Sequence, residues 1–305
     1  MAQSVSLAEI YAAFYEVDDA LRRRYVPAMD AAVTRLGVDP HDLGVLMAVV
    51  AWEPQPTTAW LFGLRGPYTS LAVYEDWLQT SASRGMLAEI EPGAYRVTGR
   101  GREVCRELLA VGRQAMEPSR SFPREEGERF AYLLKRLGEA CLSAPPPPEK
   151  WCIAHSHFHY PGDAASVMGR IDQWLTDLRS FRDDAHLAAW RVTGLSGPAL
   201  EAFTCLWRGE AVSLDAMCEK LKRRGHLREV YAAALAELRA RGWLVGSDDA
   251  PPLTDTGRQA REQIEQRTDE LFFRPWSTLS ADEQSDLLSL ARAVCRTLQY
   301  GEDTV

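Results

Sequence analysis

The hydrophobic positions in the second half of the chain repeat with the spacing of α-helices. Leu200, Phe203 and Leu206 are each three residues apart, which places them on one side of a helix. Ser213 is positioned to cap a second helix. A third helix carries an apolar stripe made of Leu227, Val230, Ala234, Leu235 and Leu238. We expect it to end at Gly242, because a basic last turn followed by glycine is a common helix stop.

A short β-hairpin is predicted to follow the third helix. Residues 243–245 form an apolar run typical of a strand, residues 247–251 have the composition of a turn, and residues 252–254 complete a second short strand. Residues 256–258 then open another long helix. Three helices followed by a hairpin is the order of elements in a winged helix-turn-helix unit.

The first half of the chain repeats this pattern. Residues 42–85 align without a gap on residues 199–242, at a constant offset of 157, and Thr98 aligns with Thr254 at an offset of 156. One residue is therefore missing between the two matches, where the tip of a hairpin is expected. The first copy predicts helices near residues 42–53, 57–65 and 69–84 and strands near 86–90 and 95–98.

The sequence between the two copies has a different character. Residues 144–148, Ala-Pro-Pro-Pro-Pro, predict a stiff extended spacer between helical segments. We therefore predict a mostly α-helical protein with small β-hairpin wings, in which tandem winged helix-turn-helix repeats flank a helical middle region. The predicted parts are an N-terminal helix with the first winged-helix copy (1–118), the middle region with its Pro-rich spacer (119–192), and the second copy with the C-terminal helices (193–305).

Three segments of the second copy resemble a known family. Residues 213–215 open the second helix, residues 238–244 run into the wing, and residues 253–258 leave it, as in the MarR-type winged-helix regulators. Residues 271–294 resemble the end of this family, whose members often finish in a helix with an L-S-x-x-E motif that packs at a dimer interface. The stretch 182–300 also resembles an uncharacterised group of actinobacterial helical proteins.

The resemblance to MarR-type regulators implies a function. It predicts a DNA-binding transcriptional regulator that responds to a small aromatic effector and is a homodimer or a monomeric pseudo-dimer. The alternative is a winged-helix scaffold that has lost DNA binding and binds a small molecule or a protein partner. The chain contains no G-x-S-x-G elbow, Walker loop or H-E-x-x-H motif, so we predict that it is not an enzyme and has no catalytic residues.

Composition narrows the class of protein further. Of the 305 residues, 46% are hydrophobic and 26% are charged, as in ordinary soluble globular proteins. The longest apolar run, residues 43–52, is too short to cross a bilayer, and the N-terminus lacks the basic start of a signal peptide. The six cysteines include no C-x-x-C pair and are typical of reduced, buried side chains. These features predict a cytoplasmic protein with no membrane partner.

Local charge identifies the candidate DNA-binding residues. The whole chain has a net charge of −8, but residues 219–241 hold seven basic and three acidic side chains, a local balance of +4. In a winged helix the turn and the third helix face the major groove of DNA. The predicted DNA-binding residues are therefore Lys220, Lys222, Arg223, Arg224, His226, Arg228 and Tyr231.

Two features of the second copy weigh against this prediction. Asp248 and Asp249 make the wing tip acidic, and the third helix is rich in alanine, which leaves few side chains to reach base edges. The third helix of the first copy carries Glu75 and Asp76 and no basic residue before Arg84. We expect the first copy to have lost any role in DNA binding, because carboxylates repel the phosphates of DNA.

Three histidines of the middle region form a candidate metal site. If this segment is extended, His155, His157 and His159 point to the same side, and three neutral imidazoles can bind zinc or a similar transition metal. The alternative is a set of hydrogen-bonded histidines at a strand edge or in a loop. No other cofactor is predicted.

The aromatic side chains allow two interpretations. Nine tryptophans and nine phenylalanines are enough to line a cavity for a small aromatic effector between the winged helices and the long helices. The simpler interpretation is that these rings fill the hydrophobic core.

Overall fold

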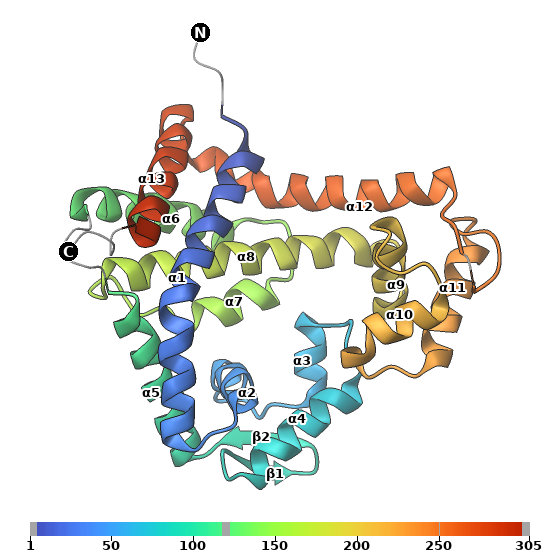
Figure 1. Cartoon of the computed structure of the whole chain (residues 1–305), viewed down its shortest axis with the longest axis horizontal. Coiled ribbons are helices and arrows are strands. Elements are labelled where there is room, and N and C mark those ends of the chain that lie inside the picture. The colour runs from blue at the N-terminus through green and yellow to red at the C-terminus, as the bar shows by residue number, and fades with distance from the viewer. Residues whose placement is uncertain (1–4, 118–122, 250, 301–305) are drawn as a thin grey trace.

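The computed structural model describes residues 5–117, 123–249 and 251–300. Within these residues the molecule is mostly helical and contains one small antiparallel sheet (Figure 1). Both features agree with the predicted fold class. Across the same ranges, no helix combines the length and the apolar character that a membrane span requires.

The first half of the chain contains the predicted succession of helices and strands. A long helix, α1 (Leu7–Leu36), precedes it and ends at Gly37, which has the positive φ of 61° common at helix ends. The elements that follow are α2 (Pro40–Trp52), α3 (Ala59–Arg65), α4 (Leu71–Ser83), β1 (Leu87–Glu91), β2 (Ala94–Val97) and α5 (Gly99–Ala115). The helices α2 to α4 and both strands lie within two residues of their predicted bounds. We call residues 40–97 the first unit.

The second unit, residues 197–254, has the same order of helices. These are α9 (Gly197–Trp207), α10 (Leu214–Lys220), the short 3-10 helix η1 (Lys222–Arg224) and α11 (Arg228–Ala240). The predicted second hairpin is reduced to one bridge between Leu244 and Leu253. Pro251 and Pro252 lack the N–H donors that would extend a ladder of strand hydrogen bonds.

The middle region and the C-terminal region supply the remaining helices. They are α6 (Arg124–Ser143), α7 (Trp151–His157), α8 (Val167–Arg191), α12 (Asp255–Phe273), the 3-10 helix η2 (Arg274–Thr278) and α13 (Ala281–Tyr300). Figure 1 shows α8 and α12 running side by side across the molecule, with the second unit at one end and α1 and α13 at the other. The segment with the L-S-x-x-E motif forms α13 and packs against α1 and α6 of the same chain.

Equivalent positions in the two units make equivalent contacts. The Thr98 hydroxyl accepts a hydrogen bond from the Gly101 N–H at 3.0 Å, and the Thr254 hydroxyl accepts one from the Gly257 N–H at 3.0 Å. Each threonine thereby caps the helix that follows its unit. A Cβ atom on either glycine would lie closer to a backbone carbonyl oxygen at the start of the hairpin region than van der Waals contact allows. The aligned sequences therefore correspond to the same local geometry.

Two hydrophobic cores hold the molecule together. The smaller one lies between α2, α4, the hairpin, α5 and the C-terminal end of α1, and it includes Leu46 and Leu78. The larger one joins α6, α8, α12 and α13 to the second unit, and it includes Trp174, Phe203 and Trp276. The second unit and the middle region therefore share a core, although the sequence pattern places them in separate parts.

Candidate functional site

Four of the cations predicted to bind DNA form ion pairs within the second unit. The N···O distances are 2.9 Å for Lys220 with Glu210, 2.5 Å for Lys222 with Glu219, 2.6 Å for Arg224 with Glu201, and 3.0 Å for Arg228 with Asp215. Each carboxylate offsets a positive charge that would otherwise attract a phosphate. Arg223 is exposed and forms no ion pair with any residue in the described ranges.

Three of the predicted residues are turned toward the interior of the molecule. The Arg224 guanidinium donates to the Thr69 hydroxyl at 3.2 Å, and the His226 Nε2 lies 2.9 Å from the carbonyl oxygen of Tyr68. Tyr231 is 1% exposed. These side chains therefore contact the first unit or the core of the second unit.

The turns that precede α4 and α11 face each other. The Ser70 N–H donates to the carbonyl oxygen of Arg224 at 2.8 Å, and Gly225 lies so close to Val73 that a Cβ atom there would clash. Gly197, at the start of α9, lies equally close to the carbonyl oxygen of Pro67. We call this junction between residues 66–73 and the second unit the turn contact. The start of α11, the part of a recognition helix that contacts DNA in helix-turn-helix proteins, therefore faces the first unit.

The solvent-facing side of α11 offers few groups to DNA. Its exposed residues after the first turn are Ala233, Ala236 and Ala240. In the acidic segment after this helix, Asp248 pairs with Arg239 at 2.6 Å. The alanine-rich surface expected from the sequence is therefore present at this face.

His155 and His157 lie in the helix α7 and His159 in the turn that follows it, so the segment is not an extended strand. The carboxylate of Asp184 accepts hydrogen bonds from the N–H groups of Cys152 and Ile153, at 2.8 and 2.9 Å, and so satisfies the first turn of α7. A helix rotates alternate residues away from each other, so the expected face of three imidazoles does not form.

The three histidine rings have separate partners. The Nε2 atoms of His155 and His159 lie 3.2 and 3.0 Å from backbone carbonyl oxygens of α2, whereas the Nδ1 of His157 lies 2.7 Å from the buried Asp177. Burial and the nearby Arg65 lower the pKa of His155 to about 3, and burial also lowers that of His159. Among the described residues, no group of three or more His, Cys, Asp or Glu side chains is arranged to hold a metal ion.

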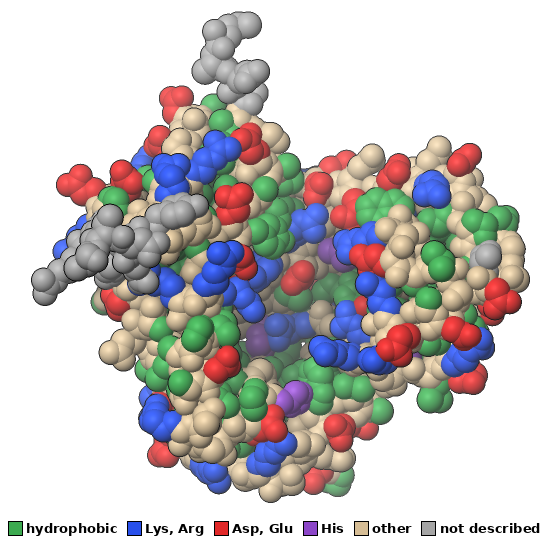
Figure 2. Space-filling model, in the orientation of Figure 1, with side chains coloured by type: hydrophobic (Ala, Val, Ile, Leu, Met, Phe, Trp, Pro, Cys, Tyr) green, Lys and Arg blue, Asp and Glu red, His purple; other side chains and the backbone are tan. Residues whose placement is uncertain are grey.

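A cavity of about 430 Å³ lies between the first unit and the middle region. Figure 2 shows a hollow at the centre of the molecule with basic and histidine side chains around it. Helices α1, α2 and α5 form an apolar side, which consists of Met29, Leu43, Met47, Leu109 and Met116. Helices α3, α5, α7 and α8 form a polar side, which includes Arg65, Arg113, His155, His159, Asp172, Gln173 and Arg179. We call this space the central cavity.

The cations of the central cavity differ in their partners. Arg179 pairs with Asp18 at 2.7 Å, and Arg113 donates to the carbonyl oxygen of His159 at 2.7 Å. Arg65 makes no hydrogen bond or ion pair with any residue that the structure describes, and its Nε is buried without a partner. Neither Arg65 nor Arg113 forms an ion pair in the described ranges, and Arg65 is the one of the three guanidinium groups that also has no hydrogen bond there.

Asp172 is the acidic group of the central cavity. It forms no ion pair in the described part of the chain, and burial together with the negative charge of Asp18 raises its pKa to about 7. Its carboxyl group therefore exchanges a proton near neutral pH, unlike an ordinary aspartate.

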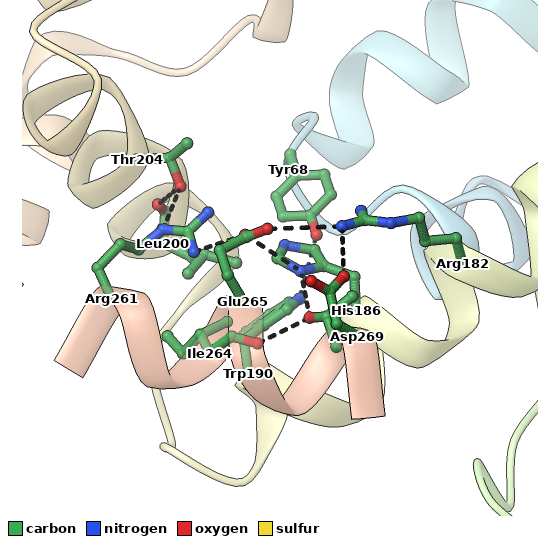
Figure 3. A network of polar contacts seen from close by, with 11 residues as sticks. Tyr68, Arg182, His186, Trp190, Leu200, Thr204, Arg261, Ile264, Glu265 and Asp269 are labelled. Carbon is green, nitrogen blue, oxygen red and sulfur yellow. Dashed lines mark hydrogen bonds and ion pairs between the residues drawn. The ribbon is translucent and has the colours of Figure 1, made fainter. Parts of the chain in front are cut away.

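A second polar cluster joins α8 to α12 (Figure 3). Arg261 is 1% exposed and donates to Glu265 at 2.7 Å, while Arg182 pairs with Asp269 at 3.0 Å. His186 lies between them, and burial lowers its pKa to about 4. These contacts neutralise the charges of the cluster and connect the two long helices.

Comparison with known proteins places the chain in a family. Residues 124–303 match the sequence model described as a helix-turn-helix family. The match covers more than half of the chain, which therefore belongs to this helix-turn-helix family. Such families consist in general of DNA-binding regulators. No curated protein and no solved structure gives a significant match.

The sequence analysis named His155 and His159 of the polar side, as metal ligands, and missed Arg65 and Asp172. Arg65 and Asp172 belong to helices of different parts of the chain, and neither stands in a motif. No tryptophan lines this cavity, and Trp174, Trp190 and Trp276 are buried in the larger core, in agreement with the simpler interpretation of the aromatic side chains. The sequence feature that could have pointed to this site is that Asp172 and Gln173 interrupt the apolar pattern of α8.

Proposed function

We propose that this helix-turn-helix protein binds a small molecule in the central cavity. The observation that carries the proposal is the cavity itself, whose apolar side faces a polar side with an unpartnered guanidinium. Its volume lies in the range of about 300–1,000 Å³ that is typical of small-molecule sites. Arg65 is partly buried and forms no close ion pair with a described residue, and an anionic ligand would supply one.

We also infer that the two units are winged helices related by internal duplication. Their gapless alignment, their common order of helices and the matched threonine caps of α5 and α12 support this inference. In this arrangement the chain is a pseudo-dimer within one polypeptide.

In the conformation described, the contacts of the second unit favour a ligand-binding scaffold over a DNA-binding protein. The turn contact covers the start of α11, and only Arg223 among the five predicted Lys and Arg residues lacks an ion-pair partner in the described ranges. A second candidate is an effector-responsive regulator of MarR type, which membership of a helix-turn-helix family favours. That function would require the two units to separate.

Fluorescence of N-phenyl-1-naphthylamine, a neutral apolar probe, tests the ligand-binding proposal. We expect the purified protein to bind this probe and the Gly44→Phe variant to lose most of the binding. Gly44 lines the cavity, and a Cβ atom there meets no atom within 4 Å, so the new ring can fill the cavity without a clash at its base. The control is Gly99→Phe, at an exposed position away from the cavity. Equal probe binding by both variants and the wild type would refute the proposal.

Selection of bound fragments from genomic DNA at low salt tests the second candidate. If the wild-type protein enriches a sequence, and the triple variant Arg223→Ala, Arg224→Ala and Arg228→Ala does not, the protein reads DNA through the second unit. Each lost phosphate contact should then reduce the slope of log affinity against log salt by about 0.9.

A further inference from the structure

We propose that the ligand of the central cavity is an aliphatic carboxylic acid, with its carboxylate on Arg65 and its hydrocarbon chain against the apolar side. This inference rests on the proposed function and adds the chemical class of the ligand. Four observations carry it: the unpartnered guanidinium, the partners of the other cations, the nature of the apolar side, and the acidic group on the wall.

Arg65 is placed to receive an anion. It is the last residue of α3, it is partly buried, and its Nε is shielded from solvent without a hydrogen-bond partner. Its positive charge is close enough to His155 to contribute to the lowered pKa of that ring. A guanidinium presents parallel N–H donors that match the two oxygens of a carboxylate.

The other cations on the wall are already engaged. Asp18 neutralises Arg179, and Arg113 donates to the carbonyl oxygen of His159 and lies near enough to Asp172 for their opposite charges to interact. The imidazoles of His155 and His159 are neutral at pH 7, because burial lowers the pKa of each. A single negative charge at Arg65 therefore satisfies the polar side.

The apolar side favours a flexible chain over a flat ring. It consists of three methionines and two leucines, and Tyr25 supplies the one phenol, indole or phenyl ring among the cavity-lining residues. Thioether side chains are flexible and adapt to irregular shapes, whereas an aromatic ligand gains most from stacking on other rings. A hydrocarbon chain can occupy this surface without such a partner.

Asp172 limits the charge of the ligand. Its carboxyl group lies on the same wall and has no ion-pair partner among the residues described. A dianionic head group such as a phosphate monoester would meet repulsion from it, whereas a carboxylate brings only one negative charge. A monoanionic acid is therefore the class that fits both Arg65 and Asp172.

Displacement of bound N-phenyl-1-naphthylamine tests the proposal with three competitors: decanoate, 1-decanol and 1-naphthoate. We expect decanoate to displace the probe at a concentration about tenfold lower than that of the neutral alcohol or of the aromatic acid, as one charge-assisted pair predicts. In the Arg65→Met variant, the affinity for decanoate should fall about tenfold, while the affinities for the probe and the alcohol stay unchanged. The matched control is Arg223→Met, which removes an exposed cation far from the cavity and should change nothing.

The outcomes separate this proposal from the proposed function. If the probe binds and decanol or naphthoate competes as well as decanoate, the ligand class is wrong and the binding site stands. The class is also wrong if Arg65→Met leaves decanoate binding unchanged. If neither the probe nor any competitor binds, as measured directly by calorimetry, the proposed function fails. If the Arg65→Met variant does not fold, the relative potency of the three competitors in displacing the probe from the wild-type protein still tests the ligand class.

Discussion

Asp172 illustrates how one buried carboxyl group can lower the stability of the fold and still contribute to a binding site. Its carboxyl group is recessed in the wall of the central cavity near Asp18, and both the burial and the neighbouring charge favour the protonated form. Arg179 and Arg113 are near enough to favour its charged form, but no described residue forms an ion pair with it. Such unsatisfied groups cluster at functional sites, because packing elsewhere must compensate for them.

The Asp172→Asn variant should therefore be more stable than the wild type at pH 8. The folded-state pKa of about 7 lies above the ordinary 3.8, so the folded protein retains a proton that the unfolded chain releases. The free energy of unfolding of the wild type should fall as the pH rises between these two values. Asparagine stays neutral, and we expect a gain of about 1–3 kcal/mol at pH 8.

Urea unfolding of both proteins at pH 4 and pH 8 checks this prediction. The gain should shrink toward pH 4, where the carboxyl group is protonated in the folded protein and partly protonated in the unfolded chain. A difference between the variants that is the same at both pH values would show that the proton is not involved.

At the scale of elements, the junction between hairpin and helix is the feature that the two units share most closely. Gly101 and Gly257 let the first turns of α5 and α12 approach the backbone of the preceding hairpin region. A threonine cap fixes the start of each helix at the same distance. The contact depends on the absence of a side chain, which is why glycine occupies both positions.

We predict that Gly101→Ala and Gly257→Ala each destabilise the protein by about 2–4 kcal/mol, because each added methyl group meets a backbone oxygen that cannot move aside freely. Gly99→Ala is the matched control, since a Cβ atom at that exposed helical position meets nothing within 4 Å. Thermal and urea denaturation give the comparison. Similar costs in the two units would support duplication, and a cost at only one site would contradict the matched geometry.

At the scale of the whole molecule, the two cores divide the chain in an unexpected way. The first unit has a core of its own, whereas the second unit is continuous with α6, α8, α12 and α13. The central cavity lies where the first unit meets the middle region. A ligand there would therefore contact both bodies.

Hydrogen exchange should detect this division. Leu78→Ala removes a buried side chain from the smaller core, and it should speed amide exchange in α2, α4 and the hairpin while leaving α8 and α12 protected. Leu178→Ala, in the larger core, should speed exchange in α8 and in the second unit together. Mass spectrometry of peptide fragments resolves the two patterns. Uniform acceleration by both variants would indicate one cooperative core.

The turn contact leads to a prediction about DNA. Gly197→Leu should separate the units, because its side chain needs the space of the Pro67 carbonyl group. If the contact keeps DNA away from α11, the variant should bind a DNA duplex at low salt more tightly than the wild type does. The Gly99→Leu variant is the control. Equal binding of the duplex by the three proteins in an electrophoretic assay would mean that the turn contact does not control the access of DNA to α11.

Much of the local structure was predictable from the sequence, for a physical reason. Helical spacing, capping residues and turn residues act over a few positions, so α2 to α4 and the first hairpin follow from the chain itself. The same local reasoning failed at the histidine segment. There, the helix depends on Asp184, which caps it from about thirty residues away.

The tertiary structure alone decided the site. Arg65 and Asp172 lie 107 positions apart and meet in one cavity because α3 and α8 pack around it. The basic segment of the second unit has the composition of a DNA-binding surface, yet three of its seven predicted residues face inward or contact the first unit. Charge and periodicity are properties of the chain, but which charges meet, and which remain without a partner, depends on contacts between segments that no local pattern records.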